Sequence, residues 1–575
     1  CFKHIFFERI NCMNAAEQAQ HFVHNETAFH LGFLPTEQSN ELSRTLEADF
    51  LRSSLDGVAT LQRVDREVLA MVKRVFQSAE YSGLVAAMEQ TLRSGGRIAF
   101  SGCGATGRLS ILLESMWRTS CRDTVGMEDY GKQVFSIMTG GDFALVKSVE
   151  FFEDYAVFGR RQVKELDLGA ADLLVAITEG GETSSVLGTV AEMAERGGKV
   201  FLLFNNPAEL LAERLERSRD AIRNPRVTVL DLFCGPMALA GSTRMQATTS
   251  EQLIAGGALE TVFARLSGEK ENIDYAAAFE KLLDTLEAPE TRKAIADYID
   301  FETEIYRQHG KVTYFTHDFL LDVFTDTTER SPTFMLPPFR AAQDTVSAQS
   351  WAFVKDVFYE TEQAWRQAMA RPLRCLRWTM PDYEEMGVSD RIKTVPAILE
   401  KDLLAFRIGN DPAPERCERE VDCAVVVAFG SEADDPEFRA ACAAQCSPYK
   451  TVRTLAIASE KGDFSLPSIA EDKRFLRLMD HTALKLVLNT ISTGVMTKYG
   501  RVSGNWMSFV ALSNKKLIDR GIRLLSELGA IPYEDAALRI FQAMEDAEKM
   551  QKPGMERICA VQLALTQLKT EQGRI

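Results

Sequence analysis

The chain has 575 residues, too many for one hydrophobic core, so we expect about three or four units of roughly 150 residues each. Its composition, 46% hydrophobic and 26% charged, is typical of a soluble globular protein. A net charge of -16 excludes DNA or an anionic membrane as the main partner.

The 11 cysteines and 7 histidines show no metal-binding or disulfide pattern. There is no CxxC, no HExxH and no Cys/His pairing at metal spacing, so we expect neither a metal nor a cofactor. Cysteines without a framework are typical of the reducing cytoplasm, where we expect this protein. No apolar run approaches the roughly 18 residues of a membrane helix, and the first residues show no signal-peptide pattern.

A glycine loop follows the first predicted strand. Residues 1–55 form a turn-rich lead-in, and residues 56–92 repeat apolar side chains at helical spacing. The short apolar run Ile98–Phe100 then breaks into SGCGATG (Ser101–Gly107) and an apolar helical pattern, which is typical of a parallel strand followed by a helix. Glycines allow amide groups to turn inward, and a helix N-terminus adds partial positive charge. The loop therefore predicts an anion site.

The ligand of this loop has alternatives. The loop spells GxGxxG between Gly102 and Gly107, but a dinucleotide site also needs an acidic residue at the end of the next strand. Glu128 and Asp129 precede that strand, Val134–Met138, and no Lys follows the last glycine as a P-loop requires. A tight turn without a ligand is the structural alternative. A phosphorylated small molecule is our first choice and a dinucleotide the second.

Strands and helices alternate after the glycine loop. Asp172–Thr178, Lys199–Phe204 and Val227–Leu232 are apolar strands between helical patterns, which predicts a parallel sheet covered by helices. The first of these strands ends in EGGETSS (Glu179–Ser185), a second loop rich in glycine and hydroxyl groups. Ligands bind at the carboxyl ends of parallel strands, so both loops are expected to face one crevice.

A third hydroxyl cluster, GSTRM (Gly241–Met245), precedes a long helical pattern. Capping of that helix by Ser242 or Thr243 is the structural alternative, because Ser and Thr are common N-caps. A third hydroxyl cluster beside the same sheet favours contact with the ligand.

The architecture then repeats. Gly310–Phe315, Asp422–Phe429 and Val452–Ala458 parallel strands of the first copy, and His481–Met496 parallels the helix after GSTRM. The loops THDFLLD and GSEADDPEF, which follow the first two of these strands, are acidic and lack the glycine pattern. Acidic side chains repel an anion, so the second copy is expected to keep the sheet and to have lost the pocket.

These patterns predict an α/β protein made of two tandem three-layer domains with parallel, flavodoxin-like sheets, plus helical termini. The expected units are an N-terminal lead-in (1–55), a first domain with intact loops (56–270), a second domain with degenerate loops (271–513) and a helical C-terminal region (514–575).

The ordered motifs SGCGATGRL, TGGD, AITEGGETS, FNNP, GSTRM and LVLNTISTGVM resemble the sugar isomerase (SIS) superfamily. Within it the chain is similar to the branch of N-acetylmuramic acid 6-phosphate etherase and glucokinase regulatory protein, from about Leu34 to Leu525. Two copies in one chain resemble the regulatory protein, whereas the etherase has one domain per chain and dimerises. The resemblance therefore implies an internal pseudo-dimer.

The resemblance also implies a phosphorylated sugar or amino sugar as ligand, in place of a dinucleotide. The implied contacts lie in the two loops and the GSTRM segment: Gly102, Gly104, Thr106, Gly107, Thr178, Glu179, Thr183 and Ser242. Thr243, next to Ser242, is a further candidate contact because it belongs to the same hydroxyl cluster. The family lysine is replaced by Gln252 in copy one and appears as Lys485 in copy two. This distribution suggests one composite site across the pseudo-dimer.

The etherase uses two glutamates, and the resemblance matches one of them with Glu150. The other position falls at Met116 in copy one, with Glu114 nearby on a different helix face. Copy two reads DTTERSPTF, which puts Glu329 at the motif position. Glu150 and Glu329 are therefore the candidate catalytic residues, and whether Glu329 reaches the pocket of copy one is left open.

Three functions are compatible with these observations. The preferred one is a regulatory or sensory protein, in which one sugar-phosphate site biases an interface with a regulated protein partner. It rests on the tandem architecture, the degenerate second pocket and Met116. The alternative is a lyase that removes the lactyl ether from N-acetylmuramate 6-phosphate, with Glu150 and Glu329 as base and acid. A phosphosugar isomerase is a third option.

Overall fold

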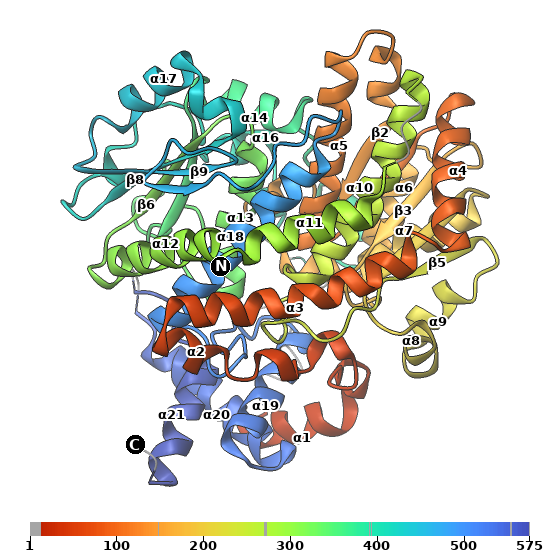
Figure 1. Ribbon diagram of the computed structural model, residues 1–575. Helices are drawn as coiled ribbons and strands as arrows, with labels where there is room; N and C mark the ends of the chain where they lie inside the picture. The colour runs from red at the N-terminus through yellow and green to blue at the C-terminus, as the bar shows by residue number, and fades with distance from the viewer. Residues whose placement is uncertain are drawn as a thin grey trace.

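The computed structural model contains two parallel sheets of five strands each (Figure 1). It describes residues 13–147, 149–269, 273–389, 392, 394–552 and 555–573, with the backbone alone at residue 150. The strand orders are β2-β1-β3-β4-β5 and β7-β6-β8-β9-β10, so the second sheet repeats the first position by position. This is the flavodoxin-like order, and the predicted class of two tandem α/β domains is confirmed.

The first sheet is made of short apolar strands, and all but the last of them are buried for most of their length. Its strands are β1 (Ile98–Gly102), β2 (Val134–Met138), β3 (Leu173–Ile177), β4 (Lys199–Phe204) and β5 (Val227–Asp231). The helices between them are α5 (Ala105–Asp123), α6 (Ala156–Glu165), α7 (Ser184–Glu195), α8 (Ala208–Arg214) and α9 (Glu216–Ile222). Continuous burial of β1, β2 and β3 is typical of a parallel sheet with helices on both faces.

The second sheet contains two strands that the sequence pattern did not reveal, the second and the last in chain order. Its strands are β6 (Val312–Thr316), β7 (Ala352–Asp356), β8 (Cys423–Phe429), β9 (Thr451–Ile457) and β10 (Phe464–Leu466). The accompanying helices are α13 (Leu320–Phe334), α14 (Thr361–Met369), α15 (Met380–Glu385), α16 (Glu400–Leu403) and α17 (Pro436–Cys446). The sequence pattern did not predict strand β7, because two of its five residues, Lys355 and Asp356, are charged although both are buried.

Long helices join the two domains into one core. Helices α10 (Gln246–Ser267) and α18 (Leu478–Tyr499) hold equivalent positions in the two copies and pack against each other. Helix α3 (Ser54–Val75) contacts both of them and also α11 (Tyr275–Glu287) and α12 (Pro289–Arg307), so it runs along both domains (Figure 1). Helix α4 (Ala79–Arg93) belongs to the first domain and packs against α10.

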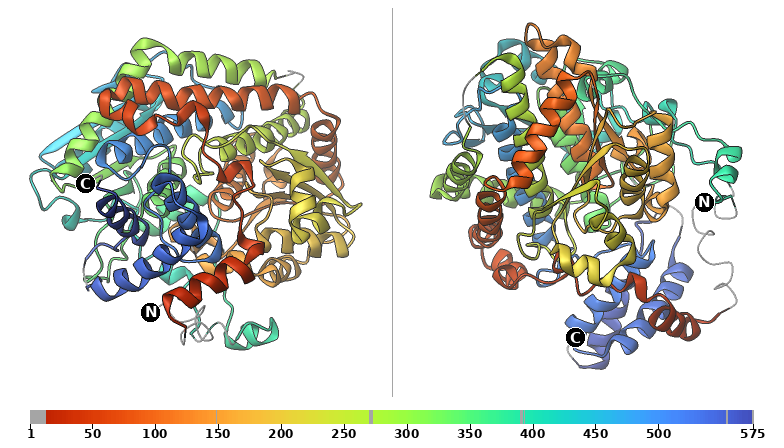
Figure 2. Two further views of the ribbon diagram at one scale, coloured as in Figure 1. Left: turned by 90° about the horizontal axis from the view of Figure 1, so that it is seen from below. Right: turned by 90° about the vertical axis from the view of Figure 1, so that its right-hand side faces the viewer.

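The chain ends form a separate group of helices (Figure 2). Helix α1 (Ala15–Asn25) packs against α20 (Tyr533–Met550), which also contacts α19 (Lys515–Gly529) and α21 (Ala560–Glu571). Helix α2 (Leu46–Arg52) follows the lead-in. The helical termini agree with the prediction. The boundaries at residues 55, 270 and 513 stay predictions. In the described part of the chain no helix is long and apolar enough to cross a membrane.

Candidate functional site

One cavity of about 230 Å³ lies where the two domains and the C-terminal helices meet. Its wall combines the loops after β1 and β3, the segment before α10, helix α13 of the second domain and the first turns of α19. The lining residues discussed below are Gly104, Arg108, Glu153, Glu179, Thr183, Ser242, Thr243, Arg244, Glu329, Asn514, Lys516 and Arg520. The cavity therefore lies at the carboxyl ends of the first sheet's strands, where such folds bind ligands.

The glycine loop forms the wall next to α5. Gly104 has a φ of 59° and directly precedes α5, whose N-terminus has no side-chain cap. A Cβ on Gly102 would lie 2.4 Å from the carbonyl group of Thr106. A Cβ on Gly107 would lie 2.9 Å from the side chain of Met138, the last residue of β2. The Thr106 hydroxyl accepts a hydrogen bond from the amide of Cys103 at 3.0 Å, so it holds the loop from inside. The uncapped amides of α5 border the cavity, an arrangement that binds anions.

The second loop brings a carboxyl group into the cavity. The Thr178 hydroxyl donates to Thr183 Oγ1 at 3.1 Å, which holds Thr183 at the start of α7. Glu179 lines the cavity and accepts a hydrogen bond from Thr243 Oγ1 at 3.3 Å. Burial, with a smaller contribution from the nearby Glu329, raises the pKa of Glu179 to about 7. Glu179 can therefore gain or lose a proton near neutral pH.

Ser242 presents a hydroxyl group that has no partner in the described part of the chain. The residue is 3% exposed, it lines the cavity, and its Oγ forms no hydrogen bond there. Helix α10 begins only at Gln246 and has no side-chain cap, so neither Ser242 nor Thr243 caps it. A buried hydroxyl without a partner is costly. A ligand in the cavity would satisfy it, which favours the contact over the capping alternative.

Glu329 belongs to the second domain but lines the cavity of the first. It lies on α13, which is tied to the first domain because Asp326, one turn earlier, contacts Arg244 at 3.1 Å. Burial raises the pKa of Glu329, while the cations Arg108 and Arg244 oppose the rise. The fold thus brings Glu329 together with the loops of copy one, which the sequence alone left open.

Helix α5, which is described throughout, contributes no carboxyl group to the cavity. Met116, at the family's glutamate position, is 4% exposed and belongs to the hydrophobic core. Glu114 contacts Arg371 at 3.0 Å and Arg118 at 2.7 Å, and it also pairs with Arg374. Burial would raise its pKa, but these three guanidinium groups lower the pKa of Glu114 to about 2. Glu114 is therefore an ionised structural partner of the arginines.

The second catalytic candidate cannot be placed by its side chain. Glu150 begins the short helical turn η6 (Glu150–Asp154), and its side chain lies outside the described residues. Glu153, in the same turn, lines the cavity and accepts a hydrogen bond from Asn514 Nδ2 at 2.7 Å. The turn therefore borders the cavity and connects it with the start of α19.

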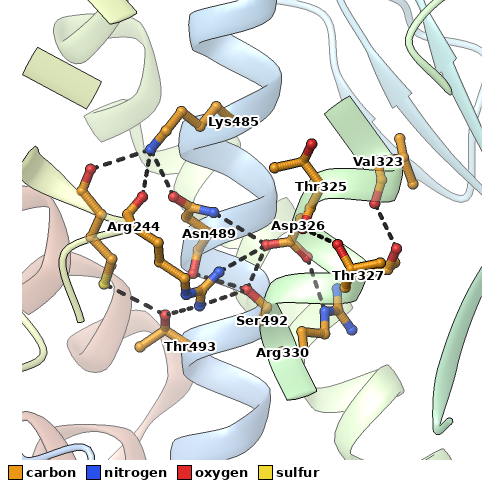
Figure 3. A network of polar contacts seen from close by, with 12 residues as sticks. Arg244, Val323, Thr325, Asp326, Thr327, Arg330, Lys485, Asn489, Ser492 and Thr493 are labelled. Atoms are coloured by element: carbon orange, nitrogen blue, oxygen red, sulfur yellow. Dashed lines mark hydrogen bonds and ion pairs between the residues drawn. The ribbon is translucent and has the colours of Figure 1, made fainter. Parts of the chain in front are cut away.

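Lys485 contacts the segment before α10 (Figure 3), and it is not among the residues that line this cavity. Its Nζ donates to the backbone oxygens of Arg244 at 2.9 Å and Met245 at 3.2 Å. It is also 2.8 Å from Thr249 Oγ1 and 2.9 Å from Asn489 Oδ1. An ammonium group has three protons, so these acceptors fully occupy it. Lys485 thus supports the GSTRM segment from the second domain, where the sequence predicted direct contact with the ligand.

Four cations that the sequence analysis did not single out surround the cavity. They are Arg108, Arg244, Lys516 and Arg520. The first two stand inside recognised motifs, SGCGATGRL and GSTRM, so their positions were available as signals. Lys516 and Arg520 come from α19, and each pairs with a buried glutamate of a distant segment. Only the fold shows that they reach the site, and together the four cations favour an anionic ligand.

Two tandem flavodoxin-like sheets with hydroxyl-rich glycine loops at one cavity define an SIS-domain protein. A family model described as the glucokinase regulatory protein N-terminal SIS domain matches residues 81–194. The N-acetylmuramic acid 6-phosphate etherase of Serratia proteamaculans is 30% identical over 258 residues, which cover 44% of this chain and 79% of the relative. Etherase 1 of Bacillus licheniformis is 29% identical over 259 residues, 44% of this chain and 77% of the relative.

The chain therefore belongs to the N-acetylmuramic acid 6-phosphate etherase family, and the resemblance inferred from the motifs is confirmed. Among solved structures, tagatose-6-phosphate ketose/aldose isomerase from Escherichia coli is similar at 12% identity and a TM-score of 0.41. That match covers 78% of this chain and 92% of the isomerase.

Proposed function

We propose that this protein binds a phosphorylated amino sugar in the cavity and cleaves the lactyl ether of N-acetylmuramate 6-phosphate. The observation that carries the proposal is Glu329, a glutamate at the family's motif position that lines the cavity from the second domain. The relatives named above carry the name of this activity. The proposal reverses the preference for a regulatory protein, because that preference rested partly on the loss of the glutamate at Met116.

The phosphate group of the substrate is proposed to bind at the glycine loop. The uncapped N-terminus of α5 offers backbone amides there, and Ser242 offers its hydroxyl. Arg108 and Lys516 add positive charge to the same cavity. Charge-assisted hydrogen bonds of this kind are about twice as strong as neutral ones, so they would hold the sugar while it reacts.

Elimination of lactate needs a base for the proton on carbon and an acid for the departing oxygen. We assign the acid to Glu329, because burial raises its pKa and so favours the protonated carboxyl. We assign the base to Glu150 on the family resemblance. One C–H and one C–O bond break and a C=C bond forms. The base takes the proton from carbon, and lactate leaves with the proton of the acid.

A second candidate function is regulation of a protein partner by the bound sugar phosphate. It is favoured by the family model, which describes a regulatory protein, and by the two domains in one chain. In this case the sugar phosphate would shift the population of a conformation that the partner recognises. The partner and the internal pseudo-dimer both belong to this proposal.

Lactate release tests the two candidates directly. The purified full chain is incubated with N-acetylmuramate 6-phosphate, and with unphosphorylated N-acetylmuramate as control. We expect lactate only from the phosphorylated substrate. If no lactate appears, but a sugar phosphate at 100 times its dissociation constant stabilises the fold by about 2.7 kcal/mol, the lyase proposal fails and the regulatory one stands.

A further inference from the structure

Of the four cations that line the cavity, three already contact a carboxylate. Lys516 and Arg520 each pair with a buried glutamate, at 2.8 Å and 2.7 Å respectively. Arg244 pairs with Asp326 at 3.1 Å (Figure 3). Arg108 lines the same cavity, and in the described part of the chain it forms no ion pair. Among these four cations, Arg108 is therefore the one whose charge is left for a ligand.

The guanidinium group of Arg108 is buried and mostly unused. The residue is 3% exposed, and its side chain donates one hydrogen bond among the described residues, from Nε to the backbone oxygen of Leu145 at 3.2 Å. Arginine keeps its charge in proteins and has five N–H donors. A buried charge without a counter-charge is strongly unfavourable. This position therefore calls for an anion.

Arg108 lies beside Glu329, where two cavities meet. A second cavity of about 30 Å³ is lined by helices α5, α10, α13 and α18. Ala105, Arg108 and Glu329 line both cavities. Burial lowers the pKa of Arg108, and Glu329 is the carboxyl group that opposes this lowering most. The guanidinium group of α5 and the carboxyl group of α13 are therefore neighbours at this junction.

The second cavity does not suit an anion. Its lining includes Asp322, Asp326 and Glu329, against the two cations Arg108 and Lys485. The ammonium group of Lys485 is already occupied by the acceptors described above. Since acidic side chains repel an anion, an anion held by Arg108 is expected in the first cavity, next to the Glu329 carboxyl group.

The proposed substrate has a second anionic group that fits this position. N-acetylmuramate 6-phosphate carries a phosphate, which we place at the glycine loop, and a carboxylate at the end of its lactyl group. In the lactyl group a single carbon atom separates the ether oxygen from the carboxylate. The acid that acts on the ether oxygen and the group that holds the carboxylate must therefore be neighbours, as Glu329 and Arg108 are.

We propose that Arg108 binds the lactyl carboxylate and so selects N-acetylmuramate 6-phosphate over sugar phosphates that lack this group. The proposal rests on the proposed lyase function and names the residue that recognises the leaving group. The guanidinium fork matches a carboxylate in a bidentate contact, which fixes orientation as well as adding binding energy. Such a contact would also hold the ether oxygen against the carboxyl group of Glu329.

The kinetic test compares N-acetylmuramate 6-phosphate with its lactyl amide, in which a neutral amide replaces the carboxylate. We expect kcat/KM of the wild type to favour the acid at least about tenfold, because a hydrogen bond to a charged group is lost with the amide. We expect Arg108→Met to lose this preference while its kcat/KM for the amide changes less than about twofold. An amide that binds without being cleaved is compared through its inhibition constant, which we expect Arg108→Met to leave equally unchanged.

Three further variants make the comparison specific. Arg118→Met is the matched control, because Arg118 lies on the same helix, pairs with Glu114 at 2.7 Å and lines neither cavity. We expect it to keep the preference of the wild type. Lys516→Met is expected to weaken both ligands by the same factor, because its proposed partner is the phosphate. Arg108→Lys keeps the charge but not the fork, so it is expected to retain part of the preference.

The preference is a ratio of two rates, so the fraction of folded enzyme cancels from it. If Arg108→Met kept the preference, or lowered both substrates equally, Arg108 would not recognise the carboxylate, and the lyase function would stand.

If the wild type released no lactate, the lyase function would fail, and binding alone would test the role of Arg108. Calorimetric titration then compares N-acetylmuramate 6-phosphate with N-acetylglucosamine 6-phosphate, which has the phosphate but no lactyl group. We expect the wild type to bind the first at least about tenfold more tightly, and Arg108→Met to bind both alike. Equal affinities in the wild type, or a preference that survives in Arg108→Met, would overturn the proposal.

Discussion

At the scale of single residues, hydroxyl groups have different roles in this site. The hydroxyl of Thr106 is turned into the glycine loop and bonds the amide of Cys103, whereas the hydroxyl of Ser242 has no partner in the part of the chain that the structure describes. The motifs that contain them look alike in sequence, as short runs of glycine and hydroxyl residues. Of these two hydroxyl groups, we therefore expect Ser242 and not Thr106 to form a full hydrogen bond with a ligand.

Replacing Ser242 by alanine is expected to weaken binding of a sugar phosphate without unfolding the protein. A hydrogen bond to a charged group contributes about 1.5–3 kcal/mol, so the dissociation constant is expected to rise at least about tenfold. Calorimetric titration with N-acetylglucosamine 6-phosphate measures the change. Ser267→Ala, at the last residue of helix α10, is the control. Equal affinities for Ser242→Ala and the wild type would remove Ser242 from the site.

The two glutamates of the turn before α6 make a second comparison. Glu153 lines the cavity, while Glu150 is assigned as the base through the family resemblance. We expect Glu150→Gln to lower kcat by about 100-fold or more, because a positioned base contributes about that much, and Glu153→Gln to have the smaller effect. Lactate release at saturating substrate measures both variants. If Glu153→Gln lowered kcat more than Glu150→Gln, Glu153 and not Glu150 would be the base.

At the scale of helices and strands, the repeated pattern was predictable and its exceptions were not. Strands of the first sheet were found because their apolar runs are short and uninterrupted, and the central helices because glycine or hydroxyl motifs precede them. Strand β7 was missed because Lys355 satisfies its ammonium group inside the fold, on the backbone oxygens of Arg407 and Asp411. Burial of a paired charge leaves no apolar signal in the sequence.

Helix α10 carries a buried carboxyl group that makes stability depend on pH. Glu251 is fully buried, and neither of its carboxyl oxygens has a hydrogen-bond partner among the described residues. Burial raises its pKa well above the ordinary value of 4.5, and the nearby Glu179 raises it further. The folded protein therefore keeps a proton that the unfolded chain loses above about pH 4.5. Its contribution to stability is complete below that pH and is lost as the pH rises toward the folded pKa.

Glu251→Gln is expected to remove this pH dependence. Relative to the wild type, the variant is expected to gain about 1.4 kcal/mol for each pH unit between pH 5 and 7. Thermal melting of both proteins at pH 5, 6 and 7 measures the difference. A difference in Tm that stays constant over this range would show that Glu251 is ionised in the fold.

At the scale of the whole molecule, the site exists only because the two domains share one interior. The segment after α14 carries Arg371 from the second domain into the first, where it contacts Asp142 at 2.7 Å and Glu114 at 3.0 Å. All three side chains are at most 3% exposed. Sequence reasoning recognised the TGGD motif that contains Asp142, but not its partner, because the arginine lies in an unpatterned loop more than 200 residues away.

Arg371→Met is expected to destabilise the protein by about 3–5 kcal/mol, because it leaves two buried carboxylates without their common partner. Arg377→Met is the control, since the Arg377 side chain is 76% exposed and its pair with Glu400 is a surface contact. That control is expected to change stability by less than about 1 kcal/mol. Denaturant unfolding followed by tryptophan fluorescence compares the two. If Arg371→Met and Arg377→Met lost similar amounts of stability, the interface between the domains would not depend on Arg371.

The whole-molecule arrangement also decides the function. The duplication, the intact glycine loop and the degenerate second loops follow from the sequence, because they are local patterns. That Glu329 reaches the first cavity, and that α19 closes it with Lys516, depends on packing between segments that lie far apart in the chain, which no local pattern records.

The most direct measurement is the turnover of Glu329→Gln with N-acetylmuramate 6-phosphate, compared with Glu432→Gln. Glu432 is another buried carboxyl of the second domain, and it lines neither cavity. We expect the wild type and Glu432→Gln to release lactate, and Glu329→Gln to bind the sugar phosphate with similar affinity but to lose about 100-fold or more in kcat. Lactate release by Glu329→Gln at the rate of the wild type would contradict the proposed role of Glu329.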